Sequence, residues 1–217
     1  MAASAREKKH AAKVVQGLRK EYPQARCSLR FTSPVQLLVA TILSAQCTDE
    51  RVNQVTRSLF KKYRSAQDFA NARLSTLERA IKSTGFYRNK AKNIKDCCTQ
   101  LVEFYGGDLP RDLNLLTELP GIGRKTANVV LGTAFGIASG VVVDTHVGRI
   151  AYRTGLTKRD PKDAVNIEAD LCERISRKEW IDFSHRVIQH GRQVCTARKA
   201  KCDECMLEAI CPRVGVK

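Results

Sequence analysis

The sequence lacks any long hydrophobic run. Its unbroken apolar stretches are only a few residues long, whereas a helix that crosses a membrane needs about 20. The first 20 residues carry basic charges without an apolar segment among them, so we expect no secretory signal. Strand patterns, internal repeats, low-complexity segments and long linkers are absent or nearly so. These absences argue against a membrane-spanning chain and predict an all-α fold.

Acidic residues are few relative to basic ones. The chain has 38 Lys and Arg residues against 22 Asp and Glu residues, which gives a formal net charge of +16. An excess of this size predicts a polyanionic partner, and nucleic acid is the most common one. An acidic membrane surface is the competing partner. The length of 217 residues allows one large domain or two small ones.

The most informative stretch is the run LPGIGRKTANVVL at residues 119–131. Pro120 fixes its own φ, while Gly121 and Gly123 allow a tight turn that another backbone or a phosphate can approach closely. Apolar residues then recur with helical spacing, at positions 127, 130, 131 and 134. Upstream, residues 112–118 predict a short helix with Asp112 as its N-cap.

This arrangement of two helices joined by a glycine hairpin predicts a binding site for a DNA backbone phosphate. The first-turn N–H groups of the second helix have no partner within that helix, so they favour an anion. An ordinary helix–turn–helix corner in an all-α core would give the same pattern. The hairpin taken alone does not distinguish these two interpretations.

Lys125 stands at the start of the second helix, beside the predicted phosphate seat. A first-turn lysine is usually a solvated charge, and the helix dipole slightly disfavours it. The same dipole, together with the adjacent Arg124 and some burial, would favour the neutral and nucleophilic form of the amine. Lys125 is therefore a candidate nucleophile.

Asp144 follows three valines and precedes a predicted helix that bears Val147 and Ile150. A plain N-cap explains an aspartate at this place. The capping role is compatible with a catalytic one, because a capping carboxylate is held rigidly and stays ionised. Such a charge suits a position near a reaction centre.

Several helix boundaries can be predicted from capping patterns. Ser33, Pro34 and Gln36 predict a capping box at the start of an apolar helix that has little polar face and belongs at the centre of the fold. The sequence STLE at residues 75–78 predicts a second capping box. Further helices are expected at 7–21, at 161–175, and from about 180 to 190 with Gly191 as the stop signal.

Four cysteines lie close together near the C-terminus, with the spacing Cys195-x6-Cys202-x2-Cys205-x5-Cys211. Without an export signal, two disulfides are disfavoured. The spacing alone leaves a tetrahedral zinc site and an iron–sulfur cluster as open alternatives. The remaining five are expected to be small buried hydrophobic residues in a reducing cell: Cys27, Cys47, Cys97, Cys98 and Cys172.

The hairpin with Lys125, the aspartate Asp144 and the four-cysteine group occur in the order found in the endonuclease III family. From about Ser33 to about Cys211 the chain resembles these enzymes, which are bifunctional DNA glycosylase/AP lyases of the helix-hairpin-helix superfamily. The resemblance implies a six-helix barrel-like domain over 27–137 that contains the helix-hairpin-helix. It also implies an iron–sulfur domain formed by 1–26 and 138–217, with a DNA cleft between the two domains.

The resemblance implies a role for each motif. The four cysteines would hold a [4Fe–4S] cluster that is structural rather than catalytic. Lys125 would attack the deoxyribose C1′ to form a Schiff base, and Asp144 would offset the positive charge on the sugar. The substrate would be duplex DNA with an oxidised or ring-saturated pyrimidine such as thymine glycol. We expect a monomer with no membrane partner, which is cytoplasmic and nucleoid-associated if the source is bacterial.

Further residues are expected to contact the DNA. By resemblance, Gln46 fills the stack after a base leaves it, although its segment also reads as an inter-helix turn. Phe86 would insert as a wedge into the strand opposite the lesion; bacterial members of the family often have leucine at this position. An aromatic residue after a turn is, however, more often a packing anchor. The other expected contacts are hairpin residues and one residue of the basic loop between the cysteines: Gly121, Ile122, Gly123, Arg124 and Lys199.

Three other functions compete with this one. Adenine-mismatch glycosylases share the hairpin, the aspartate and the cluster, but they typically lack the lysine and carry a further C-terminal domain. Lys125 and the end of the sequence at Lys217 therefore argue against that class. A non-catalytic helix-hairpin-helix module would bind DNA without needing both Lys125 and Asp144. A zinc-bearing nucleic-acid adaptor is the least favoured alternative.

Overall fold

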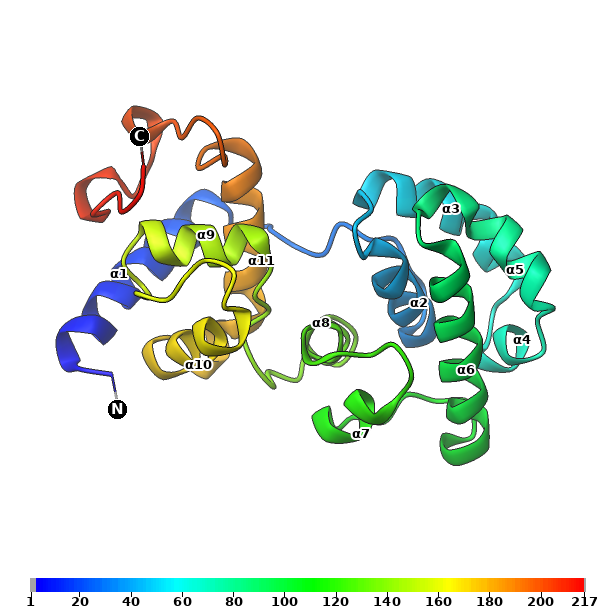
Figure 1. The fold of residues 1–217 in the computed structure, drawn as a ribbon. Coiled ribbons are helices and arrows are strands. Elements are labelled where there is room, and N and C mark those ends of the chain that lie inside the picture. Colours follow the sequence, from blue (N-terminus) through cyan, green and yellow to red (C-terminus); the bar gives the residue numbers. More distant parts are fainter. Residues whose placement is uncertain (1–2, 217) are drawn as a thin grey trace. The chain divides into compact units, whose positions relative to one another are not determined.

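The computed structural model describes residues 3–216, and within them the regular structure is helical, with one isolated β-bridge between Cys195 and Ala200 (Figure 1). The described chain divides into two compact units. Cys27–Ile137 forms one unit, named here the hairpin unit. The chain up to Arg26 and the chain from Ala138 onward form the other, named here the cysteine unit. Among residues 3–216, every helix is too short or too polar to span a bilayer.

The hairpin unit is built around one apolar helix. Its elements in order are α2 Pro34–Ser44, α3 Asp49–Lys62, α4 Ala66–Ala70, α5 Leu74–Ile81, the 3-10 turn η1 Lys82–Thr84, α6 Tyr87–Tyr105, α7 Leu113–Glu118 and α8 Arg124–Phe135. Helix α2 buries nearly all its side chains and packs against α3, α6 and α8. The expected central position of this helix within its unit is therefore confirmed.

The start of α2 follows the prediction with one correction. The Ser33 hydroxyl accepts a hydrogen bond from the Gln36 N–H (3.3 Å), and Pro34 occupies the first turn. The Gln36 carboxamide does not return to the Ser33 N–H as a capping box requires. It accepts instead from the backbone N–H and the hydroxyl of Thr32, both at 2.9 Å. The predicted capping box is therefore wrong, because the Gln36 side chain bonds to Thr32, one residue before the N-cap Ser33.

The second predicted capping box, at residues 75–78, is also wrong. Helix α5 begins at Leu74, and its N-cap Arg73 makes no side-chain capping bond. The Arg73 carbonyl already accepts from the N–H groups of Thr76 (2.9 Å) and Leu77 (3.1 Å). Ser75 thus lies inside the first turn, where it cannot act as a cap.

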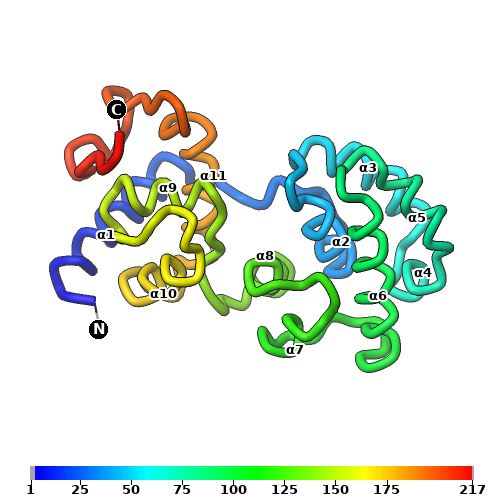
Figure 2. The backbone as a smooth tube through the Cα atoms, viewed as in Figure 1, coloured from blue at the N-terminus to red at the C-terminus, as the bar shows by residue number. Residues whose placement is uncertain are grey.

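The cysteine unit packs helices from both ends of the chain around a second core (Figure 2). Its elements are α1 Ala5–Glu21, α9 Thr145–Arg153, α10 Ala164–Arg174, η2 Arg177–Glu179, α11 Trp180–Gln193, η3 Cys202–Glu204 and η4 Glu208–Ile210. Helix α11 packs against α1 and α9, and Val14, Phe183 and Val187 are fully buried or nearly so. Ser4 and Glu7 form a capping box at the start of α1.

The predicted stop signal at Gly191 is wrong, because α11 continues to Gln193. Gly191 is buried where α11 meets α9, and a Cβ there would lie 2.7 Å from His146 Nδ1 and 3.0 Å from Arg149 Nη2. This glycine is therefore required by the close approach of two helices. A glycine that only ends a helix would not require a second helix so close to it.

We predict that Gly191→Ala destabilises the protein by about 1–3 kcal/mol, because the added methyl group overpacks the contact with α9. Alanine normally stabilises a helix interior relative to glycine by up to about 1 kcal/mol, so the sign tests the packing argument. Thermal unfolding followed by circular dichroism measures the effect. Gln193→Ala, at an exposed position of the same helix, is the control and should change stability by less than about 0.5 kcal/mol. A Gly191→Ala midpoint above that of the parent would contradict the account.

Candidate active site

The predicted helix-hairpin-helix is present in the hairpin unit. The Asp112 carboxylate caps α7 by accepting from the N–H groups of Asn114 (2.8 Å) and Leu115 (3.1 Å). The chain turns through Gly121, whose φ is 76°, and α8 begins after the N-cap Gly123. Gly123 offers no side chain to the first turn of α8, which leaves that turn suited to an anion.

The hairpin is held by its own buried residue and by α6. Ile122 is 4% exposed and belongs to the core, and its N–H donates to the Leu119 carbonyl (3.1 Å). A Cβ at Gly121 would lie 2.7 Å from the Cβ and Nδ2 atoms of Asn93 on α6. The side chain of Ile122 thus anchors the turn from inside, and any contact that this residue makes with DNA falls to its backbone.

Lys125 lies on the exposed side of the first turn of α8. Burial therefore does not favour the neutral form of its amine, because Ala127, Val130 and Leu131 occupy the buried face of the helix. Among the described residues, the Lys125 amine has no hydrogen bond or ion pair. The amine is therefore accessible to a ligand that binds at the hairpin.

Gln46 and Phe86 share an unusual backbone conformation. Their φ values are 53° and 47°, in the left-handed region that non-glycine residues rarely adopt. Gln46 is exposed just after α2, and Phe86 is 64% exposed just before α6. The interpretation of Phe86 as a packing anchor is wrong; the next residue, Tyr87, packs against the core instead. Strain at two exposed residues of these types points to a functional use.

In the cysteine unit, Asp144 is the N-cap of α9, as predicted. One of its carboxylate oxygens accepts from the N–H groups of His146 (2.9 Å) and Val147 (2.8 Å). The side chain is half-buried, and its other oxygen has no hydrogen-bond partner among the described residues. Burial lowers the pKa of His146, and the neighbouring Asp144 opposes that shift. The carboxylate is thus held in place by one oxygen while the second remains available.

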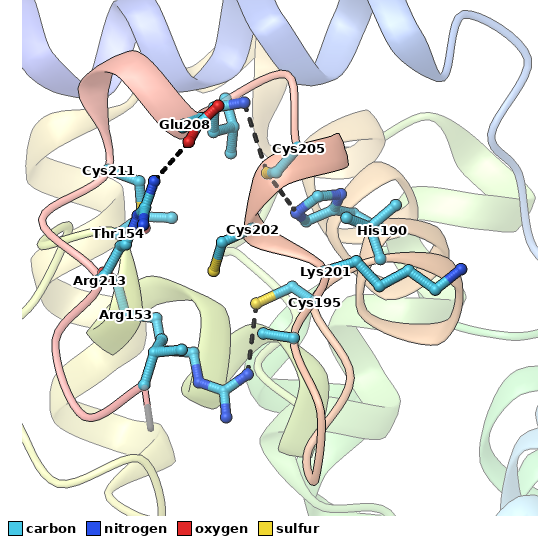
Figure 3. Close-up of a pocket in the computed structure, with 14 residues that line it drawn as sticks. Arg153, Thr154, His190, Cys195, Lys201, Cys202, Cys205, Glu208, Cys211 and Arg213 are labelled. Carbon is cyan, nitrogen blue, oxygen red and sulfur yellow. Dashed lines mark hydrogen bonds and ion pairs between the residues drawn. The ribbon is translucent and has the colours of Figure 1, made fainter.

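The four predicted ligand cysteines come together around one pocket of the cysteine unit (Figure 3). The residues that line the pocket include Cys195, Cys202, Cys205 and Cys211. Burial raises the pKa values of Cys205 and Cys211, and the neighbouring cysteines raise them further. Within residues 3–216, no three His, Cys, Asp or Glu side chains are arranged around a point that a single metal ion could occupy.

Two of these sulfur atoms accept hydrogen bonds from the protein. Arg153 Nη1 donates to Cys195 Sγ (3.4 Å), and the Leu207 N–H donates to Cys205 Sγ (3.4 Å). His190 Nε2 lies 3.7 Å from Cys205 Sγ. Donors of this kind stabilise thiolates.

The segment between Cys195 and Cys202 carries the predicted DNA contact Lys199, whose side chain is exposed. The backbone of this loop is fixed, because the Thr196 hydroxyl donates to the Lys199 carbonyl (2.6 Å) and accepts from the Lys199 N–H (3.3 Å). The exposed side chain is accessible to a ligand. The role itself stays a prediction.

Sequence reasoning missed two arginines of α9 that hold this loop. Arg149 donates to the carbonyls of Gly191 (3.1 Å) and Cys195 (3.0 Å). Arg153, 9% exposed, donates to the Thr196 carbonyl (2.7 Å). Their spacing of four residues, one helical turn, was the available signal.

Comparison with known proteins places the chain in a family. Residues 39–177 match the model of the HhH-GPD superfamily of base excision DNA repair proteins. The endonuclease III of Synechocystis sp. is 52% identical over 208 residues, which cover 96% of this chain and 94% of that protein. The endonuclease III of Bacillus subtilis is 45% identical over 197 residues, with 90% and 88% covered.

A solved structure of a trapped endonuclease III–DNA covalent intermediate has a TM-score of 0.89 with this protein at 42% identity, covering 95% of this chain and 96% of that one. The helical fold and the superfamily match define the class, a base excision repair protein with a helix-hairpin-helix. Within that class, the chain belongs to the endonuclease III family.

Proposed function

We propose that this protein removes oxidised pyrimidines from duplex DNA through a Schiff base on Lys125 and then cuts the strand by β-elimination. It is a base excision repair glycosylase of the endonuclease III family. The observation that carries the assignment of Lys125 is its place, an accessible amine in the first turn of the helix that follows the hairpin. A relative that is 42% identical was trapped as a covalent intermediate with DNA, as a nucleophilic mechanism requires.

Binding comes before chemistry and uses charge and backbone groups. The net charge of +16 supplies affinity for the DNA backbone without regard to sequence. A backbone phosphate would sit at the hairpin between Gly121 and the start of α8, where the first-turn N–H groups and the helix dipole favour an anion. Arg124 and Lys199 would add further phosphate contacts.

A base inside the double helix is out of reach of the amine, so the nucleotide must leave the stack at a cost of a few kcal/mol. Gln46 and Phe86 would occupy the vacated space, Gln46 in the damaged strand and Phe86 against the opposite strand. Their exposure and their left-handed backbone support this role. Side chains that are already extended from the surface need no rearrangement before they insert.

The chemistry joins one nitrogen to one carbon. The neutral Lys125 amine attacks C1′ of the deoxyribose, and the glycosidic bond breaks as the base leaves with its electron pair and takes up a proton. The sugar ring then opens: the nitrogen lone pair forms a C1′=N double bond while the C1′–O4′ bond breaks, and O4′ takes up the proton that the amine has given up, which leaves a protonated imine. This cation acidifies the C2′ hydrogen, so loss of that proton expels the 3′ phosphate and nicks the strand.

Asp144 would support these steps electrostatically. An ordinary lysine has a pKa of about 10.4 and is neutral in only about one molecule in 2,500 at pH 7, so the attack needs an acceptor for the amine proton. The carboxylate oxygen of Asp144 that caps α9 is engaged, and the other is available. The proposal requires Asp144 and Lys125 to act on the same nucleotide.

We also assign a [4Fe–4S] cluster to Cys195, Cys202, Cys205 and Cys211. The four thiols line one pocket, yet within residues 3–216 no three of them are arranged around a point that a single ion could occupy, which favours a multi-atom cluster over zinc, whose four ligands converge to about 2.3 Å from one atom. When bound, the group would supply a covalent cross-link of the C-terminal segment and no step of the reaction. The cysteines would then hold the loop that carries Lys199 against α9 and α11.

We predict that Lys125→Ala abolishes the adduct that borohydride traps between the protein and a duplex containing thymine glycol. Loss of the nucleophile should slow strand nicking by at least about 10³-fold. Denaturing gel electrophoresis of the trapped complex measures it. Lys61→Ala, which removes an exposed lysine of α3, is the control for loss of charge. Equal trapping by Lys125→Ala and the parent would exclude Lys125 as the nucleophile.

For Asp144→Asn we expect base release to slow by about 10²–10³-fold while DNA affinity and thermal stability are retained. Asparagine caps a helix about as well as aspartate, so the substitution removes the charge and keeps the cap. Asp112→Asn makes the same change at the cap of α7 and should leave the rate unaltered. Single-turnover kinetics separates the outcomes, and a parental rate for Asp144→Asn would reduce this residue to a structural cap.

The purified protein should be brown and contain about four iron and four sulfide per chain, with the colour lost on oxidation. Cys202→Ser should lower the iron content and the midpoint of thermal unfolding. Cys27→Ser, in the hairpin unit, should alter neither the iron content nor the colour. Elemental analysis decides between the metals, and one zinc per chain without iron would overturn the assignment.

A further inference from the structure

Lys90 is a buried lysine to which the proposed mechanism gives no role. It lies in the first turns of α6, and the residue is only 5% exposed. Its amine donates to the carbonyls of Leu43 and Thr84, both at 2.8 Å. A buried ammonium is costly unless strong acceptors surround it, and a hydrophobic residue of similar length would fill the same space without that cost. The lysine therefore calls for an explanation beyond packing.

The two carbonyls belong to the segments that end in Gln46 and Phe86. Leu43 lies in the last turn of α2, shortly before Gln46, and Thr84 closes η1, shortly before Phe86. The partners are separated from Lys90 by 47 and 6 residues in sequence. One buried side chain thus connects the backbones of both segments, close to the residues that precede Gln46 and Phe86.

Two further observations support the bridge. Burial lowers the pKa of Lys90, and the nearby Cys47, which directly follows Gln46, opposes that shift. Gln46 and Phe86 both have a left-handed backbone, and such conformations persist only where the surrounding structure holds them. Hydrogen bonds from one buried amine to both segments are a means of holding these conformations.

We propose that Lys90 is a positioning residue for base excision, which fixes the spacing of the Gln46 and Phe86 segments so that both enter the DNA together. This inference rests on the function proposed above. Two side chains that fill opposite strands at one lesion must be separated by a set distance. Lys90 sets that distance with two hydrogen bonds to backbone atoms, so it acts independently of the side chains that insert.

The same helix supplies a matched control. Lys95, also on α6, donates to the carbonyls of Ala70 and Ala72. It therefore ties the chain between α4 and α5 to α6 by the same chemistry, and neither carbonyl belongs to the segments of Gln46 or Phe86. Lys95→Met measures what the loss of such a brace costs the fold.

The test compares Lys90→Met with Lys95→Met and the parent in the full-length protein. A thymine-glycol duplex carrying 2-aminopurine opposite the lesion reports disturbance of the stack when saturated with enzyme, and single-turnover kinetics reports base release. We expect Lys90→Met to reduce the fluorescence change and to slow base release by about 10-fold to 100-fold, the range that a small misplacement costs. Lys95→Met should match the parent in both, after both variants are measured well below their unfolding midpoints.

Lys90→Gln keeps one shorter donor and should give an intermediate defect, and it carries the test if Lys90→Met does not fold. Parental fluorescence and base release in the Lys90 variants would overturn the inference. Equal defects in the Lys90 and Lys95 variants, in proportion to lost stability, would do the same. Absence of any borohydride adduct with the parent would overturn the proposed function instead, and the fluorescence of the bound duplex would still report on Lys90.

Discussion

The hairpin unit depends on the burial of α2. This helix has almost no polar face, so water is excluded from it only if other helices cover it on several sides. Helices α3, α6 and α8 do so, and each is thereby held where the proposed function needs it. The end of α2 presents Gln46, the start of α6 presents Phe86, and the start of α8 presents Lys125. Burial of one apolar helix thus positions three side chains that are themselves exposed.

The exposed residues Gln46 and Phe86 have strained backbones that buried groups hold in place. Gln46 and Phe86 have left-handed backbone conformations. Lys90 connects the backbones of the two segments that lead to these residues. The hairpin follows the same principle, because the buried side chain of Ile122 fixes a turn whose two glycines are exposed. In each case a buried group holds a segment whose outer part is left available for a ligand.

Features that depend on neighbouring residues could be predicted from the sequence. The caps Ser33, Asp112 and Asp144 were found because each bonds to N–H groups within three residues. The four cysteines around the pocket were found because their spacing is itself the signal. The helical fold followed from periodicity, and the family followed from three motifs in order.

Features that depend on tertiary contacts could not be predicted. Gly191 resembled a helix stop, and its actual constraint is a neighbouring helix. The exposure of Lys125 depends on which face of α8 meets the core. Ser75 is not a cap, because the helix already begins with the Arg73 carbonyl accepting from the N–H groups of Thr76 and Leu77. Lys90 resembled one more basic residue, because its partner Leu43 is 47 residues away. No local pattern signals a buried bridge of this kind.

The central claim is that one primary amine, that of Lys125, becomes covalently bonded to deoxyribose. Peptide mapping by mass spectrometry, after borohydride reduction of the complex with a thymine-glycol duplex and digestion of the DNA, tests it most directly. The account predicts that the sugar remnant is found on the peptide that contains Lys125. A remnant on any other lysine, or base excision without a covalent remnant, would contradict it.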